Sequence, residues 1–184
     1  MKIFGLCGHP ASGKDTVADF FVAHGYTHIS TGDLLRAEMR KAGIPVDRAH
    51  MSEFAAKNKK ERGYGYLAEL AVAAITSGNG AAFDKAVVSG LCAGLEIDML
   101  RKGFGSDFKL LAIDAPLETR YERARKRNRP GDDISFETFK AQEERERASV
   151  SGAQEVDEVI SMADVNIDNS GSIESLHAQL AAIV

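Results

Sequence analysis

A segment near the N-terminus has the residue types and the spacing of a phosphate-binding loop. It fits the pattern G-x-x-x-x-G-K and continues for two residues, as Gly8-His9-Pro10-Ala11-Ser12-Gly13-Lys14-Asp15-Thr16. The glycines let the backbone fold tightly so that several N–H groups point inward, and a helix starting there adds about half a positive charge. Lys14 then reaches the outer phosphates as a mobile point charge. We expect this whole segment to contact a bound nucleoside triphosphate, because an apolar run precedes it and a helical pattern follows.

The residue after the lysine departs from the usual form of such a loop. Asp15 stands where Ser or Thr usually helps to hold Mg²⁺, and Thr16 comes one place later. Asp15 could contact Mg²⁺ through water or serve only as an acid in the first helical turn. Thr16 could supply the hydroxyl group instead. We expect the metal contact to have moved to Asp15 or Thr16 rather than to be lost.

A second group of residues suited to phosphate chemistry is a basic run after residue 119. It comprises Arg120, Arg123, Arg125, Lys126, Arg127 and Arg129. Arginines spaced three or four residues apart lie on one helical face, so Arg120, Arg123 and Arg127 can converge. Phosphoryl transfer needs positive groups around the charged equatorial oxygens more than it needs a base. The alternative is a solvated helix end, where cations complement the helix dipole.

The elements that must position these residues alternate between strands and helices. Short apolar runs predict strands at 3–7, 26–30, 86–89, 108–113 and 165–167. Helical patterns follow the loop and recur at 31–41, 47–60, 64–76, 95–102, 117–126, 136–150, 156–162 and 172–183. Since no hairpin turn joins the strands, the pattern predicts an α/β fold: a mainly parallel five-stranded sheet with helices on both faces. Ligands bind at the carboxyl ends of such strands, which places the loops after Cys7, Ile29, Ser89, Ile113 and Ile167 around one site.

Composition narrows the class of protein and its partners. The 184 residues suit one domain, 1–184, and the formal net charge of -4 counts against nucleic acid as a partner. Two distant cysteines, Cys7 and Cys92, suit reduced thiols in a cytosolic protein. No apolar stretch approaches the ~20 residues of a membrane-spanning helix. We therefore expect a cytoplasmic protein with no membrane partner, and the sequence leaves its oligomeric state open.

The loop and a second motif resemble those of adenylate kinases. Members of that family also have proline third in the loop and threonine two places after the lysine, and the segment Ile29–Arg36 looks like their second motif. The rest of the chain, with its basic run at 120–129 and its tail at 163–172, is similar to dephospho-CoA kinases. It is closer still to small P-loop proteins, many of them archaeal, that have been compared with those kinases. The resemblance implies a three-layer P-loop NTPase fold with ATP as phosphoryl donor and Mg²⁺ as cofactor. It also implies a helical acceptor-binding part at about 31–80 and a short lid at about 120–134.

Individual roles follow from this resemblance. Thr31 and Arg36 would hold the acceptor or its phosphate, and Asp33 would orient the attacking oxygen or a metal-bound water. Asp33 could equally be the third residue after a helix cap at Ser30, and Arg36 a solvated helix arginine.

The resemblance also assigns roles beyond the acceptor-binding part. Arg123 and Arg127, in the lid, would join Lys14 and Asp33 in catalysis. Asn169 would lie in the loop that passes the adenine, or in a plain turn.

Two positions break the family pattern. The resembling families end the strand at 86–89 with an acidic residue and place an arginine three residues later, where this chain has Ser89 and Cys92. The leading hypothesis is ATP-dependent, Mg²⁺-assisted phosphoryl transfer to a small acceptor such as a nucleoside monophosphate or dephospho-CoA. Because the acid and the arginine are missing, the alternative is a nucleotide-binding regulatory module with little or no kinase activity.

Overall fold

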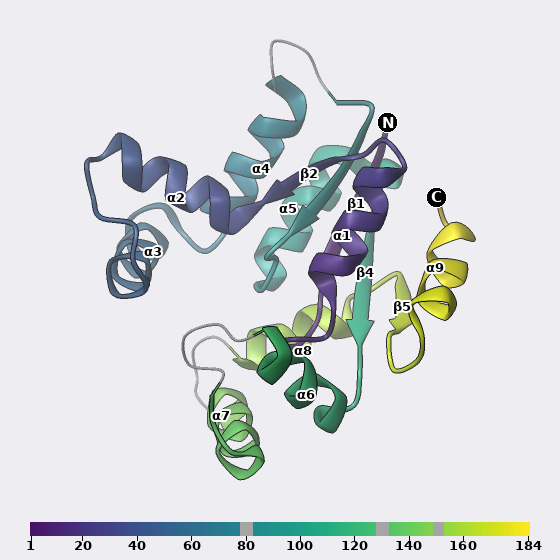
Figure 1. The fold of residues 1–184 in the computed structure, drawn as a ribbon. Helices are drawn as coiled ribbons and strands as arrows, with labels where there is room; N and C mark the ends of the chain where they lie inside the picture. The colour runs from purple at the N-terminus through teal and green to yellow at the C-terminus, as the bar shows by residue number, and fades with distance from the viewer. Residues whose placement is uncertain (78–82, 128–132, 149–152) are drawn as a thin grey trace.

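A computed structural model describes residues 1–77, 83–127, 133–148 and 153–184. Its strands are β1 (Lys2–Cys7), β2 (Thr27–Ser30), β3 (Lys85–Ser89), β4 (Phe108–Asp114) and β5 (Val165–Asp168). They form one sheet in the order β2-β3-β1-β4-β5, and every pairing is parallel (Figure 1). The α/β fold expected from the alternating pattern is therefore confirmed.

The helices also lie where the sequence predicts them, with ends that differ by a few residues. Their bounds are α1 (Lys14–Ala23), α2 (Thr31–Lys41), α3 (Arg48–Arg62), α4 (Tyr66–Ser77), α5 (Gly94–Phe104), α6 (Leu117–Arg127), α7 (Phe136–Ala148), α8 (Ala153–Ser161) and α9 (Ile173–Ala181). Within the described ranges, no helix combines the length and the apolar character needed to cross a membrane.

Strand β1 is buried on both faces because its side chains alternate between two cores. Ile3 and Cys7 belong to the core covered by α4, α5 and α8. Phe4 and Leu6 belong to the opposite core, which α1 and α9 cover. Side chains of successive strand residues point to opposite faces, so an apolar run is what a central parallel strand requires. This double burial fixes the loop after Cys7 on a rigid support.

A smaller core holds α2, α3 and α4 together at one side of the sheet. Leu35, Met39, Tyr66 and Leu67 are buried there, and Met51 and Phe54 pack against them. In Figure 1, α2 and α3 extend away from the sheet on the left. These helices occupy most of the expected acceptor-binding part at about 31–80, of which residues 78–80 lie outside the described ranges. Their binding role stays a prediction.

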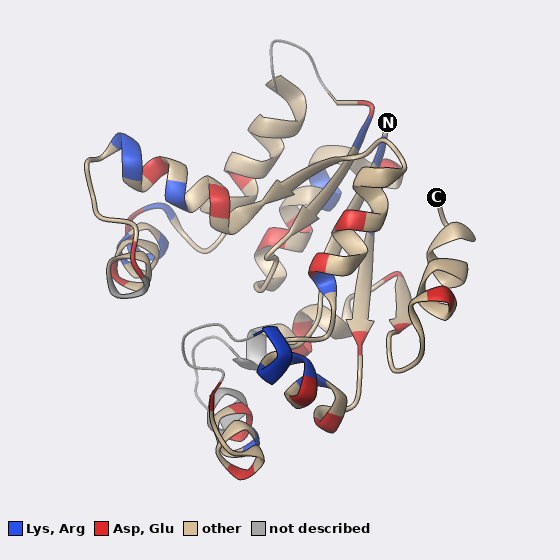
Figure 2. Cartoon of the chain, viewed as in Figure 1, with Lys and Arg blue, Asp and Glu red and all other residues tan. Residues whose placement is uncertain are grey.

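The expected lid at about 120–134 is described only in part. Arg120 to Arg127 lie in α6, and Tyr121 donates a hydrogen bond from its hydroxyl group to the carbonyl of Ile134 at 3.0 Å. Arg129, part of the basic run, falls in the range 128–132 and lies outside the described residues. Figure 2 shows basic residues gathered at the C-terminal end of α6.

Candidate functional site

The loop between β1 and α1 needs glycine at both ends. Gly8 has φ +137° and Gly13 has φ +104°, values that L-residues rarely adopt. A Cβ at Gly8 would lie 2.2 Å from the carbonyl oxygen of Ile113, and one at Gly13 would lie 2.1 Å from Nδ2 of Asn169. The loop backbone therefore packs directly against the ends of β4 and β5. Because Gly13 precedes α1, the positive end of that helix opens at the loop.

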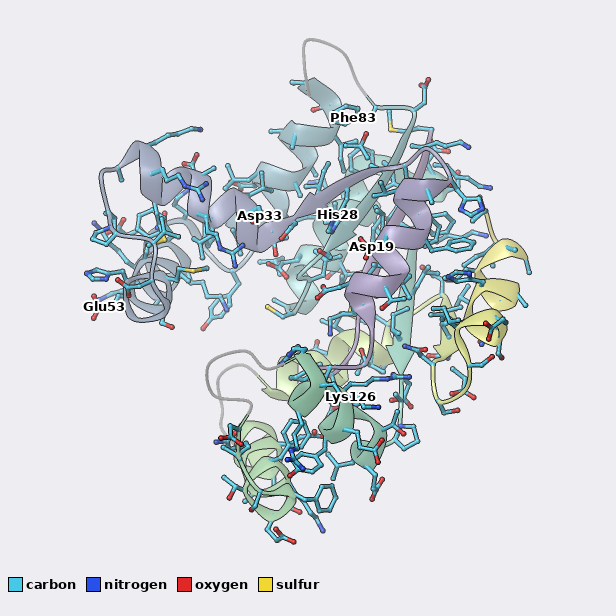
Figure 3. All side chains as sticks on the ribbon, in the orientation of Figure 1. Asp19, His28, Asp33, Glu53, Phe83 and Lys126 are labelled. Atoms are coloured by element: carbon cyan, nitrogen blue, oxygen red, sulfur yellow. The ribbon has the colours of Figure 1, made fainter. Side chains whose placement is uncertain are left out.

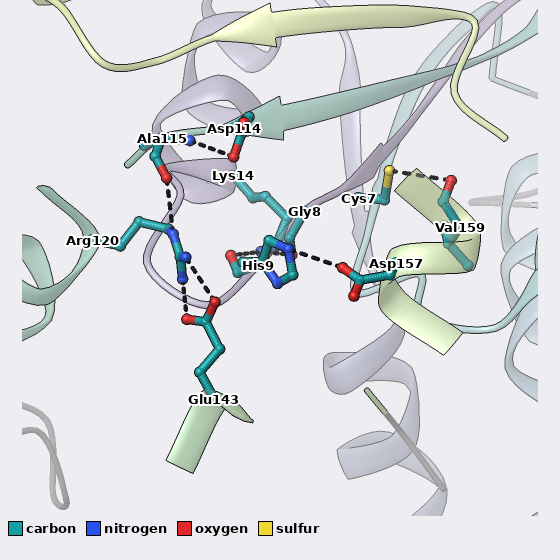
Figure 4. Close-up of polar contacts among 10 residues, drawn as sticks. All are labelled: Cys7, Gly8, His9, Lys14, Asp114, Ala115, Arg120, Glu143, Asp157 and Val159. Atoms are coloured by element: carbon teal, nitrogen blue, oxygen red, sulfur yellow. Dashed lines mark hydrogen bonds and ion pairs between the residues drawn. The ribbon is translucent and has the colours of Figure 1, made fainter. Parts of the chain in front are cut away.

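The ammonium group of Lys14 lies inside the loop. Its Nζ donates hydrogen bonds to the carbonyls of Gly8 at 2.7 Å and His9 at 2.8 Å (Figure 4). Burial lowers the pKa of Lys14 to about 8; the carboxylate of Asp15 opposes this change, and the guanidinium groups of Arg120 and Arg127 add to it. Lys14 is thus held among cations, in a place where an anionic ligand would stabilise its charged form.

A pocket of about 440 Å³ opens between the loop and α6. Its lining consists of Pro10, Ala11, Gly13, Lys14, Asp15, Thr16, Arg123 and Arg127. This volume lies in the range of small-molecule sites, roughly 300–1,000 Å³. The structure therefore brings most of the expected loop residues together with two expected lid arginines.

Arg123 and Asn169 hold the loop through hydrogen bonds to its backbone. Asn169 is buried and donates from Nδ2 to the carbonyl of Ser12 at 2.7 Å. Arg123 donates to the same carbonyl at 3.4 Å and to the carbonyl of Asn169 at 2.7 Å. The Asn169 side chain therefore contacts the loop itself, while its expected place beside an adenine ring stays a prediction.

Arg120 does not line the pocket with its two neighbours on α6. It is 4% exposed, and its Nε donates to the carbonyl of Ala115 at 2.9 Å. Its two Nη atoms donate to the Glu143 carboxylate of α7 at 2.5 and 2.8 Å (Figure 4). Glu143 has no signal in the sequence, because α7 carries several glutamates and nothing in the local pattern singles out one of them.

Helix α8 contacts the loop from the other side. Asp157 lies 3.1 Å from Nε2 of His9, and the Cys7 thiol donates to the carbonyl of Val159 at 3.8 Å (Figure 4). Burial raises the pKa of the Cys7 thiol to about 11, as expected for a core residue. No local sequence pattern marks Asp157 as a partner of the loop either.

The residues expected to bind the acceptor lie apart from this pocket. Thr31 is buried, and its hydroxyl donates to the carbonyl of Gly90 at 2.9 Å. Asp33 and Arg36 form an exposed ion pair at 2.6 Å on α2, where Figure 3 labels Asp33. The amide of Asp33 donates to the Ser30 hydroxyl at 3.3 Å, so the helix cap at Ser30 is present. None of the three expected acceptor residues is among those that line the pocket.

The two positions that break the family pattern are filled by locally bonded neutral residues. Ser89 ends β3, and its hydroxyl lies 2.8 Å from Nε2 of His28 on β2. The amide of Cys92 donates to the buried carboxylate of Glu96 at 2.9 Å. The end of β3 therefore presents a Ser–His pair where the resembling families have a carboxylate.

Comparison with known proteins shows the family to which this chain belongs. The family model described as "AAA domain" matches residues 3–148. A UPF0200 protein of Pyrococcus abyssi is 33% identical over 180 residues, which cover 97% of this chain and 93% of that protein. A UPF0200/UPF0201 protein of Archaeoglobus fulgidus is 29% identical over 187 residues; the chain spans 55% of its length.

Solved structures agree with the fold. TT1252 from Thermus thermophilus has a TM-score of 0.57 at 22% identity, covering 100% of this chain and 98% of that one. A shikimate kinase from Bacteroides thetaiotaomicron has a TM-score of 0.56 at 15% identity, covering 99% and 96%. The narrower likeness to adenylate and dephospho-CoA kinases stays a prediction. The chain belongs to the AAA domain family and to the UPF0200 proteins, and its fold is that of the P-loop kinases.

Proposed function

We propose that this protein transfers the γ-phosphoryl group of ATP to a small acceptor. The observation that carries the proposal is the pocket in which the phosphate-loop residues and Lys14 face Arg123 and Arg127 of α6. Solved structures with this fold include small-molecule kinases, among them a shikimate kinase. That likeness supports nucleotide-dependent phosphoryl transfer in general and leaves the acceptor open.

The charges around the pocket suit a reaction in which negative charge moves over phosphate oxygens. Lys14 and the start of α1 approach a bound triphosphate from one side, and Arg123 and Arg127 approach it from α6. Preorganised cations of this kind stabilise the transition state because they need no reorganisation when charge moves. Arg123 is already held by the carbonyls of Ser12 and Asn169, so its position is set before ligand binds.

The residues at the pocket fit a bound Mg²⁺. Asp15 and Thr16 line the pocket and carry oxygen donors, which Mg²⁺ prefers. The described residues contain no cluster of three or more His, Cys, Asp or Glu that would hold a metal alone, so most ligands would come from phosphate and water. When bound, Mg²⁺ would neutralise charge on the phosphates.

The acceptor would bind beside α2, α3 and α4. We carry forward Thr31, Asp33 and Arg36 as its contacts, with a nucleoside monophosphate or dephospho-CoA as the first compounds to try. Binding would require Arg36 to exchange its partner Asp33 for a ligand, which their exposure permits.

The test is a transfer assay with γ-labelled ATP and Mg²⁺ over a panel of nucleoside monophosphates, dephospho-CoA and small hydroxylated metabolites. We expect a labelled product with the wild type and none with Lys14→Ala. Lys126→Ala is the matched control: Lys126 is an exposed cation on α6, labelled in Figure 3, and it does not line the pocket. Normal turnover by Lys14→Ala would refute the assignment.

A second candidate is a regulatory module that binds the nucleotide with little or no transfer. It is favoured by the Ser89–His28 pair at the end of β3, where the resembling kinases have a carboxylate. Calorimetry separates the two candidates: ATP binding that depends on Lys14, with no labelled product from any acceptor, supports the module.

A further inference from the structure

One arginine of α6 is buried although arginine side chains are usually exposed. Arg120 is 4% exposed, whereas Arg125 and Lys126 on the same helix are exposed. Burying a guanidinium group is costly unless its charge is paired and its donors are satisfied. Its Nε and both Nη atoms meet this condition through Ala115 and Glu143. The arrangement is therefore specific rather than a chance surface contact.

The buried pair lies next to the phosphate pocket. Arg120 precedes Arg123 by three residues on α6, so the two share one helical face. Arg123 contacts the loop at the carbonyl of Ser12. The pair therefore joins α6 to α7 one helical turn away from the arginine that contacts the loop.

Helix α7 brings the carboxylate to this place through its own packing. Phe136 and Phe139 pack against the ring of Tyr121 on α6, with centroids 5.3 and 5.6 Å apart. Next in the chain, α8 holds the loop through Asp157 and His9 at 3.1 Å. Carboxylates of two successive helices therefore hold the two sides of the pocket, Glu143 on the α6 side and Asp157 on the loop side.

We propose that Glu143 is a positioning residue for phosphoryl transfer: by fixing Arg120 it sets the place of α6, the helix from which Arg123 and Arg127 line the pocket. Its carboxylate also balances the charge of the buried Arg120. This inference rests on the proposed function. It goes beyond that function in assigning a role to α7, none of whose described side chains lines the pocket.

The test compares Glu143→Gln with Glu144→Gln in the full-length protein. Gln keeps the shape of the side chain but loses the charge and one acceptor of the two-point contact. We expect kcat to fall roughly ten- to a hundredfold because α6 loses its fixed position, with a smaller change in KM for ATP. Glu144, an exposed neighbour on α7 that lies 3.9 Å from Lys140, is the matched control and should leave both constants unchanged.

The division of the loss between kcat and the affinity for ATP separates positioning from simple stabilisation. A merely structural role for Glu143 would lower the fraction of folded enzyme and leave kcat per active site at the wild-type value. Loss of positioning lowers kcat per active site while the Kd for ATP stays near that of the wild type, because Lys14 and the loop are unchanged in the variant. Calorimetric titration with ATP gives both the fraction of active sites and the Kd.

A second variant tests whether the loss of activity in Glu143→Gln comes from a folding defect. Arg120→Met combined with Glu143→Met replaces the pair by apolar side chains of similar length, a change that proteins often tolerate. We expect a folded protein with the wild-type affinity for ATP, but with the low kcat of Glu143→Gln. Wild-type kcat in Glu143→Gln, or full kcat in the double variant, would overturn the inference. A wild type that neither binds ATP nor transfers phosphate would refute the proposed function itself, and this inference with it.

Discussion

At the scale of single residues, the loop depends on what its glycines approach. Gly13 must be a glycine because Asn169 occupies the space a Cβ would take, and Asn169 in turn holds the carbonyl of Ser12. Gly25, after α1, has a similar φ of +83° but has nothing within 4 Å of its added Cβ. A substitution at Gly25 therefore introduces backbone strain alone, whereas one at Gly13 introduces strain and a steric collision.

This difference predicts the effect of Gly13→Ala against Gly25→Ala. The control should lose about 1 to 2 kcal/mol of unfolding free energy through backbone strain alone. Gly13→Ala should lose about 2 to 5 kcal/mol, because the collision adds to the strain, and it should also weaken ATP binding. Urea denaturation and calorimetry measure both quantities. Equal stability losses with unchanged ATP affinity would contradict the role given to Asn169.

At the scale of elements, helix starts place the residues around the site. The start of α5 is held by a buried carboxylate: Glu96 accepts hydrogen bonds from the amides of Cys92 at 2.9 Å and Ala93 at 3.1 Å. These amides lie between β3 and α5, so Glu96 fixes the connection that contains Cys92, one of the two positions that break the family pattern. A carboxylate in the first turn also interacts favourably with the positive end of the helix dipole.

We predict that Glu96→Ala destabilises the protein by about 2 to 3 kcal/mol, because two amides lose a charged acceptor in a buried place. Asp98→Ala, at an exposed position of the same helix, should change stability by less than about 0.5 kcal/mol. Thermal or chemical unfolding monitored by circular dichroism compares the two variants. A loss for Glu96→Ala no larger than for Asp98→Ala would show that the connection is held in another way.

At the scale of the molecule, strand order decides where the loop lies. β1 is central, and the chain places β3 and β2 on one side of it and β4 and β5 on the other. A crevice forms at the carboxyl ends of strands where the order reverses in this way, and such a crevice is the usual ligand site of an open α/β sheet. The loop after β1 opens into this place, and α6 covers it after β4.

A ligand that binds only the folded protein stabilises the whole molecule. With Mg²⁺ and ATP at about 100 times Kd, the gain is about 2.7 kcal/mol, which corresponds to a rise in Tm of roughly 5 to 10 °C for a chain of this size. Lys14→Ala should lose this rise, while Lys126→Ala should keep it. Differential scanning calorimetry measures the shift in Tm. An equal rise in Lys14→Ala would show that the stabilisation by ATP does not depend on the loop lysine.

The sequence alone determined the elements and the loop, because both depend on local order. Short apolar runs predict buried strands, helical spacing predicts helices, and the glycines with Lys14 predict a phosphate-binding turn; the structure confirms the strand before that turn and the helix after it. A resemblance drawn from the same residues indicated the kinase-like fold. These features are readable because neighbours in the chain decide them.

The tertiary structure decided which side chains meet across the chain. Asn169 reaches Ser12 across 157 residues, and Arg120 selects Glu143 among the acids of α7. It also left Asp33 and Arg36 of α2 outside the lining of the pocket between the loop and α6. Such partners depend on how helices pack on the sheet, and the exposed or buried state of an arginine follows from that packing rather than from its spacing. Arg120, Arg123 and Arg127 have the same helical phase in sequence, yet only the folded protein separates the buried anchor from the two that line the pocket.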